Sequence, residues 1–317
     1  MRWRNLFFYK KWMNHQHLPE HVNVVQGPMG SCGALFEMAE RSGRRVLKVF
    51  DAPNSHPTTY YGYWQRECDI YSPGYNVPMS RKVLASVNRE LEMADMILCP
   101  STFVRDTMVM NGIPHEKCFI SHFGVNTSIF KPRQKIPLAP TFVCVGTICL
   151  RKGHQYLFRA FKKVKEQMPN ARLICIGIVR PDFKKEWELW KDTFEHHQHL
   201  DHSELADLLT TASAFVFPSM EEGFARVLSE ALAVGLPIIT THESGGTTVI
   251  RDQEEGLIVR ARDVEGLTSA MIRLASDPDL CAEMGGKALL IGSCSNTWAD
   301  YTLRLYNEYV RRLIAYS

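Results

Sequence analysis

Short apolar runs alternate with longer amphipathic stretches along the first part of the chain. Only 53–78, which is rich in Tyr, Pro and Gly, breaks the pattern, and we expect it to be irregular. The order strand, helix, strand predicts a parallel sheet covered by helices. Predicted strands are 22–26, 45–50, 96–99 and 117–122, and predicted helices are 34–39, 84–93 and 101–112.

The same pattern begins again after 131–140, a stretch with three prolines that we interpret as an interdomain linker. The sequence therefore predicts an α/β protein with two Rossmann-like, doubly wound parallel-sheet domains that face a cleft, where such sheets bind ligands. Later predicted strands are 141–145, 172–178, 214–218 and 237–241, and predicted helices are 154–168, 203–212, 225–234 and 298–314.

The predicted domains have unequal strand numbers. We expect an N-terminal domain at 1–135 and a C-terminal domain at 140–296. The last helix, within 297–317, is expected to pack back on the first domain. About four strands precede the linker, against about six in a complete doubly wound unit. The first domain is therefore expected to be incomplete.

Composition and charge exclude several protein classes. Of 317 residues, 45% are hydrophobic and 22% are charged, which argues against a disordered chain, a coiled coil or a disulfide scaffold. The formal charge of +3 is too small to indicate a nucleic-acid binder, although it suits a polyanionic substrate. The chain is long enough for two buried cores.

Cysteine usage and the lack of long apolar runs indicate a cytoplasmic protein. Nine cysteines are present, and Cys99, Cys144 and Cys175 lie inside strand-like runs, where Cys acts as a small hydrophobe. No run approaches the length of a membrane span, and we expect no signal peptide. The opening MRWRNLFFYKKWM fits either a helix packed on its own domain or a peripheral contact with an anionic membrane.

The segment FVFPSMEEGFARVLSEALAVGLPIITT combines acids with a helix start directly after a predicted strand. Glu222 lies in the turn, and Glu230 lies about 10 Å further along the helix. The backbone amides of Gly223, Phe224 and Ala225 open the helix and form a candidate anion site for a diphosphate. Carboxylates beside an anion site suit a sugar nucleotide, whose hydroxyls donate hydrogen bonds while its phosphates accept them.

This segment resembles the E-x7-E signature of retaining family 4 glycosyltransferases, also called group 1 glycosyl transferases, which have the GT-B fold. The flanking motifs HSELADLLTTASAFVFPS, SGGTTVIRDQEEGLIV and GVNTSIFKP are similar to segments of that family. The resemblance implies that the domain at 1–135 is the acceptor side and that the domain at 140–296 binds the donor. It further implies that Glu222 contacts the donor sugar and that Glu230 holds the ribose hydroxyls. It also implies metal-independent, retaining transfer of a hexose-type sugar from a UDP- or GDP-sugar to a glycan, lipid or small-molecule acceptor, with no cofactor.

The segment VGTICLRKGHQYL supplies positive charge after the first strand of the second predicted domain. The family usually carries an Arg directly after Gly146 and a Lys before the next glycine. Here Thr147 replaces the Arg, whereas Lys152 matches the family pattern. We therefore expect Lys152 to bind the diphosphate and Arg151 to substitute for the missing Arg. Gly146 and Thr147 are expected to belong to the same donor-binding site. Cations matter here because the leaving diphosphate develops negative charge.

His56 is a candidate catalytic residue in the first predicted domain. It follows a predicted strand at the position where relatives carry a short segment that ends in His. By resemblance it would face the donor sugar from across the cleft. A loop histidine without a catalytic role remains the alternative.

Two segments imitate metal sites. HHQHLDH, at 196–202, is dense in imidazole, but neighbouring side chains of a strand point in opposite directions, so zinc is not expected. Asp277, Pro278 and Asp279 spell a metal-binding triplet of another glycosyltransferase fold, but they separate two predicted helices. We interpret them as a turn and a helix cap.

Two rival functions remain open from the sequence. Gly27, Gly30 and Gly33 after a strand, with Asp51 at the end of the next strand, imitate the dinucleotide fingerprint of an NAD-dependent oxidoreductase, although the glycine spacing differs. The other rival is a catalytically impaired remnant, which would bind a nucleotide sugar without transferring the sugar. The acceptor, the nucleobase and the oligomeric state cannot be read from the sequence.

Overall fold

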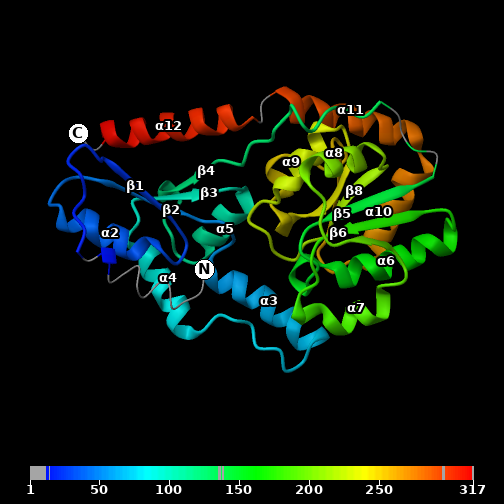
Figure 1. The fold of residues 1–317 in the computed structure, drawn as a ribbon, viewed down its shortest axis with the longest axis horizontal. Helices are drawn as coiled ribbons and strands as arrows, with labels where there is room; N and C mark the ends of the chain where they lie inside the picture. Colours follow the sequence, from blue (N-terminus) through cyan, green and yellow to red (C-terminus); the bar gives the residue numbers. More distant parts are fainter. Residues whose placement is uncertain (1–11, 14, 135–136, 138, 295–296, 316–317) are drawn as a thin grey trace.

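The chain forms two parallel β-sheets that lie side by side and are covered by helices (Figure 1). The computed structural model describes residues 12–13, 15–134, 137, 139–294 and 297–315. The smaller sheet has the order β1 (Val24–Pro28), β2 (Leu47–Asp51), β3 (Met96–Cys99) and β4 (Cys118–Ile120). The larger sheet has the order β10 (Gly256–Val259), β9 (Ile238–Thr241), β8 (Ala214–Phe217), β5 (Thr141–Val145), β6 (Arg172–Ile176) and β7 (Glu195–His197).

Every described strand pair is parallel, which confirms the predicted α/β class. Helices connect successive strands, as a parallel sheet requires. In the first part they are α2 (Cys32–Arg41), α3 (Pro57–Tyr71), α4 (Arg81–Met93) and α5 (Thr102–Met110). In the second part the connecting helices are α6 (His154–Gln167), α7 (Lys184–Trp190), α8 (His202–Thr210) and α9 (Arg226–Ala233), and two short 3-10 helices lie between β9 and β10. Helices α10 (Val264–Ser276), α11 (Pro278–Cys294) and α12 (Trp298–Ala315) follow β10.

Local sequence signals place several of these elements. The apolar runs predicted at 96–99 and 141–145 are β3 and β5 with the expected bounds. Ser101 caps α5, because its Oγ accepts a hydrogen bond from the Val104 N–H at 3.2 Å. Gly112, just after that helix, has a φ of +91°, a conformation that glycine adopts without strain.

Helix α3 was not predicted, and the interpretation of 53–78 as wholly irregular is wrong. Pro57 occupies its first position, and the His56 Nδ1 accepts a hydrogen bond from the Thr58 N–H at 3.3 Å. Aromatic and β-branched residues and Gly62 give this segment a low helix propensity. Its stability comes from tertiary packing, because Trp64 and Cys68 are buried in the core of the larger sheet.

Helix α12 crosses back to lie along the smaller sheet (Figure 1). Its apolar side chains Leu305, Tyr309 and Leu313 pack against strands β2 and β3. Arg312 donates hydrogen bonds to the carbonyl oxygens of Asp95 at 3.2 Å and Glu116 at 2.8 Å. The last helix of the described chain is thereby attached to the smaller sheet.

Several predictions about organisation are not decided by this arrangement. The limits 1–135 and 140–296 stay predictions, and residues 135, 136 and 138 of the predicted linker lie outside the described part. Most of the opening segment, 1–11, also lies outside it. No helix within the described ranges is both long and apolar enough to cross a membrane.

Candidate active site

A cavity of about 450 Å³ opens where the strand order of the larger sheet reverses. From β5 the chain first adds β6 and β7 on one side, and later β8, β9 and β10 on the other. Doubly wound sheets bind ligands at such a switch point, outside the carboxyl ends of the strands. The lining residues are Phe123, Val145, Gly146, Lys152, Glu222, Phe224, Ala225, Arg226, Val227, Glu230 and Trp298.

Both acids of the E-x7-E segment line this one cavity, and so does Lys152. The predicted Gly146, Phe224 and Ala225 line it as well. Ala225 is the N-cap residue of α9, and among the described residues no side chain caps that helix start. The positive end of the helix is therefore presented toward the cavity without a competing carboxylate cap.

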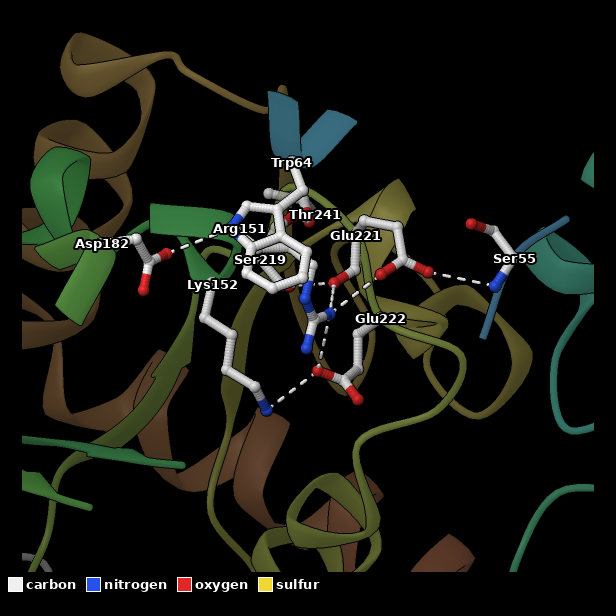
Figure 2. A network of polar contacts seen from close by, with 9 residues as sticks. All are labelled: Ser55, Trp64, Arg151, Lys152, Asp182, Ser219, Glu221, Glu222 and Thr241. Atoms are coloured by element: carbon white, nitrogen blue, oxygen red, sulfur yellow. Dashed lines mark hydrogen bonds and ion pairs between the residues drawn. The ribbon is translucent and has the colours of Figure 1, made fainter. Parts of the chain in front are cut away.

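Glu222 forms an ion pair with Lys152 inside the cavity (Figure 2). Its Oε2 lies 2.8 Å from the Lys152 Nζ and 3.4 Å from the Arg151 Nη1. Burial alone would raise the pKa of Glu222, but the two cations hold it below its ordinary value. Glu222 is therefore a carboxylate at neutral pH and can accept hydrogen bonds from hydroxyl groups.

Arg151 has other partners than the phosphates expected for it. Its guanidinium donates to the backbone carbonyl of Glu221 and, at 2.8 Å, to the carboxylate of the same residue (Figure 2). It also lies over the Tyr60 ring of α3, 5.3 Å from the centroid. Arg151 does not line the cavity, so Lys152 is the cation of this basic pair that faces it.

Glu230 lies on the second turn of α9 and is half-buried. Burial raises the pKa of its carboxyl, and electrostatic interactions with His202 and Arg226 partly offset that rise. Arg226 is exposed at the cavity edge. This end of the cavity therefore offers a carboxylate beside a cation.

Gly223 lies at a close contact between the two halves of the protein. A Cβ at this position would collide with the carbonyl oxygen of Pro53, which follows β2. The Gly223 carbonyl also accepts a hydrogen bond from the Ser101 Oγ at 2.5 Å. The backbone at Gly223 therefore packs closely against the loop that follows β2, and the predicted role of its amide in binding a diphosphate stays a prediction.

His56 and Thr147 do not line the cavity. His56 is buried and serves as the N-cap of α3, while its backbone N–H donates to the Thr107 Oγ1 at 3.0 Å. Burial lowers the pKa of its imidazole, which favours the neutral ring. Its capping bond gives His56 a structural role independent of any catalytic one.

Sequence reasoning missed several residues at or beside the cavity. Arg226, Phe123 and Trp298 line it, and Glu221 lies directly behind it. The Phe123 ring contacts the Phe224 and Trp298 rings at centroid distances of 6.2 Å each, forming an aromatic wall. Of these, only Glu221 carried a local signal, because it is an acid next to the signature.

The glycine-rich turn after β1 is blocked as a dinucleotide site. The buried carboxylate of Glu90 accepts hydrogen bonds from the amides of Gly30 at 2.7 Å and Gly33 at 3.1 Å. Those amides are the groups that would hold a pyrophosphate. The smaller sheet also has no reversal of strand order within its described strands. Both observations argue against the oxidoreductase alternative.

The two metal-like segments have ordinary structural partners. The His196 Nε2 pairs with the carbonyl oxygen of Gly177 at 2.8 Å, and its ring lies against Trp187. The Asp277 carboxylate accepts from the Leu280 N–H at 2.9 Å, which confirms the predicted helix cap.

Comparisons with known proteins point to one family. The family model "Glycosyl transferases group 1" matches residues 126–289. The chain is 26% identical to the sulfoquinovosyl transferase SQD2 of Arabidopsis thaliana over 75% of its length and 49% of that relative. It is 25% identical to a GDP-mannose-dependent phosphatidylinositol monomannoside mannosyltransferase of Mycobacterium tuberculosis over 66% of its length and 59% of that relative. The chain thus spans about half the length of the curated relatives it matches.

Solved structures with low sequence identity share the fold. Sucrose-phosphate synthase from Thermosynechococcus elongatus superposes with a TM-score of 0.78 at 20% identity, over 99% of this chain and 78% of that one. Anabaena HepE, solved in complex with UDP and glucose, gives 0.72 at 13% identity, over 95% and 79%. These similarities confirm the predicted GT-B fold.

Proposed function

Because the chain belongs to the group 1 glycosyl transferases, we propose that it transfers a hexose-type sugar from a UDP- or GDP-sugar to an acceptor. The observation that carries this proposal is the single cavity lined by Lys152, Glu222, Glu230 and the start of α9. That cavity offers acceptors for hydroxyl groups and positive groups for phosphates within one volume. The acceptor would be a glycan, a lipid or a small molecule.

In the proposed complex, the diphosphate lies on Lys152 and the amides at the start of α9. Glu222 accepts hydrogen bonds from the donor sugar, and Glu230 accepts them from the ribose. Lys152 then exchanges its ion pair with Glu222 for the phosphate oxygens. The exchange frees lone pairs of Glu222 for the sugar at the moment when the donor binds.

We propose a retaining, metal-independent reaction. The bond between the anomeric carbon and the diphosphate breaks, and the acceptor oxygen bonds to that carbon on the same face. The acceptor proton passes to the departing diphosphate. Lys152 stabilises the charge that develops on the diphosphate, which lowers the barrier without requiring a general acid.

The relatives support a nucleotide-sugar donor. Mannosyltransferases named as GDP-mannose-dependent match 66% of this chain at 25% identity. A glycosyltransferase of colanic acid biosynthesis matches 61% at 27% identity, which agrees with a role in polysaccharide synthesis. The structure records eight free cysteines among the described residues, and we propose a reducing, cytosolic location, with or without peripheral membrane contact.

A thermal-shift panel tests the proposed function. UDP, GDP, ADP, their sugars and NAD are each added to the purified chain. We expect a uridine or guanosine diphosphate, alone or as its sugar, to raise the melting temperature, because a ligand that binds only the native state stabilises it. NAD is expected to have no effect. The proposal is rejected if no nucleotide sugar stabilises the protein.

Donor consumption separates an enzyme from a binding remnant. The stabilising sugar nucleotide is incubated with the protein and a panel of glycan and lipid acceptors. Release of the nucleoside diphosphate that depends on an acceptor supports transfer. If the protein binds the sugar nucleotide but releases no nucleoside diphosphate, neither with an acceptor nor by slow hydrolysis, the impaired remnant is favoured.

A further inference from the structure

Behind the cavity, the carboxylate of Glu221 is completely buried between the two sheets. Both of its oxygens are used (Figure 2). Oε1 accepts a hydrogen bond from the Ser55 N–H at 3.0 Å, and Oε2 accepts one from the Arg151 Nη1 at 2.8 Å. Ser55 follows β2 of the smaller sheet, whereas Arg151 follows β5 of the larger one. Glu221 therefore connects the two halves of the protein.

Arg151 lies between two carboxylates. Its Nη1 is 2.8 Å from Glu221 and 3.4 Å from the Glu222 oxygen that pairs with Lys152. Burial alone would lower the pKa of Arg151, but the two acids raise it above its ordinary value, so the guanidinium stays charged. The shorter and deeper contact is the one with Glu221. Without the charge of Glu221, the nearest carboxylate for Arg151 would be Glu222.

We propose that Glu221 is a positioning residue that keeps Arg151 closer to itself than to Glu222 and directs it away from the donor. This inference rests on the proposed function and names a residue that the function did not use. Glu221 leaves Lys152, at 2.8 Å, as the closest cation that Glu222 must release when the donor binds, while Arg151 keeps only a longer contact of 3.4 Å with Glu222. A second strong partner for Glu222 would compete with the hydroxyls of the sugar.

Charge balance predicts two opposite effects when Glu221 is neutralised. Burial raises the pKa of Glu221, but the ion pair with Arg151 opposes that rise and favours the carboxylate. Arg151 and Lys152 are therefore balanced by Glu221 and Glu222, so loss of one acid leaves an excess positive charge beside the diphosphate site. The excess charge strengthens binding of a nucleoside diphosphate. Glu222, which then pairs more closely with Arg151, becomes a poorer acceptor for the hydroxyls of the sugar, so turnover falls. A purely structural role predicts no tighter binding.

The variant Glu221→Gln keeps the shape of the side chain and an oxygen for the Ser55 N–H. Calorimetry with UDP or GDP, whichever binds the wild-type chain, and donor kinetics give Kd, kcat and KM. We expect Kd to fall roughly fivefold, the size of about 1 kcal/mol of added attraction. We expect kcat to fall by about tenfold or more.

Glu67→Gln is the matched control. Glu67 is also completely buried at the contact between α3 and the larger sheet. It accepts hydrogen bonds from Gln155 at 2.8 Å, Tyr156 at 2.9 Å and Arg262 at 2.7 Å, and it does not line the cavity. We expect a lower melting temperature but a nucleotide Kd within about twofold of the wild type. Equal behaviour of the two variants would overturn the inference.

The double variant Glu221→Gln with Arg151→Met supplies an independent test. It leaves neither a buried unpaired charge nor a competitor for Glu222. Wild-type nucleotide affinity, with kcat higher than in Glu221→Gln alone, is expected. A tenfold loss of affinity would identify Arg151 as a phosphate ligand and contradict the proposal. This variant decides the question even if Glu221→Gln alone does not fold.

The wild-type protein separates failure of this inference from failure of the proposed function. If it binds no nucleoside diphosphate, the proposed function fails. If it binds and turns over a donor while Glu221→Gln matches Glu67→Gln, only the role of Glu221 is rejected.

Discussion

At the scale of single residues, two basic side chains that look equivalent in the sequence have different partners in the structure. Arg151 and Lys152 are neighbours, yet Arg151 pairs mainly with the buried Glu221 while Lys152 pairs with Glu222 in the cavity. A buried carboxylate needs a partner that can form several hydrogen bonds, and a guanidinium meets this need better than an ammonium group. The flexible Lys152 is left to exchange partners when a ligand arrives.

Replacing Lys152 by Met tests its assignment to the diphosphate. Loss of the cation that stabilises the leaving group should lower kcat by roughly 100-fold or more. The nucleotide Kd should rise as well. Steady-state kinetics and calorimetry measure both. Lys162→Met, on the exposed face of α6, serves as the control, and a similar loss there would remove the case for Lys152.

Glu230 predicts a pH dependence with opposite signs for stability and binding. Burial raises the pKa of the Glu230 carboxyl in the native state above its value in the unfolded chain. The unfolded chain therefore loses this proton first as the pH rises, which destabilises the native state. The contribution of Glu230 to stability is complete below the ordinary carboxyl pKa and is lost as the pH rises through the native pKa. Nucleotide affinity should instead weaken as the pH falls through that native value, because the protonated carboxyl is a poorer acceptor for the ribose.

The comparison of Glu230→Gln with the wild type isolates these effects. Melting temperature and nucleotide Kd are measured for both proteins across the acid range. The stability of the wild type relative to the variant should increase toward low pH, and its advantage in affinity should disappear there. Parallel pH profiles for the two proteins would show that Glu230 does not titrate in this role.

At the scale of elements, α3 belongs to the first part of the chain but packs against the core of the larger sheet. It follows β2, but Trp64 and Cys68 belong to the core of the larger sheet. The Trp64 Nε1 donates to the Asp182 carboxylate at 3.1 Å, and the Arg180 guanidinium lies 5.1 Å from its ring centroid. The helix therefore depends on packing across the two halves, which its own sequence pattern does not reveal.

Trp64→Ala should destabilise the protein by about 3–5 kcal/mol, because it removes a buried ring and leaves the Asp182 carboxylate without its indole donor. Denaturant unfolding measures the change in the free energy of unfolding. Ile70→Ala on the same helix is the control, since Ile70 is 54% exposed and its loss should cost about 0.5 kcal/mol or less. Equal costs would mean that α3 is not held by its contact with the larger core.

At the scale of the whole molecule, the two halves contact each other at the turn after β8, which contains Glu221, Glu222 and Gly223. Ser101, the cap of α5, donates to the Gly223 carbonyl, and the Thr102 N–H donates to the Thr248 Oγ1 at 2.9 Å. Gly223 itself lies against the Pro53 carbonyl. The turn that carries Glu221 and Glu222 is thus held from both sides, which fixes the geometry of the cavity.

Gly223→Ala should separate the sheets locally, because the added methyl group has no room against the Pro53 backbone. Overpacking of this kind costs about 1–3 kcal/mol, and we also expect lower donor affinity. Gly62→Ala is the matched control. Gly62 lies inside α3 with open space around a new Cβ, so alanine there should stabilise the helix by about 0.5–1 kcal/mol. Thermal unfolding of both variants checks the two signs, and an unchanged Gly223→Ala protein would contradict the closed contact.

The sequence by itself determined the two parallel sheets and the segment that carries the candidate chemistry. Apolar periodicity, the Ser101 cap and the spacing of Glu222 and Glu230 are short-range properties of the chain, so they are legible without coordinates. The tertiary structure alone decided the position of α3, the partner of Arg151 and the neighbour of Gly223. Each of these depends on which surfaces meet across the two sheets, and residues distant in sequence carry no local mark of the contacts they will make.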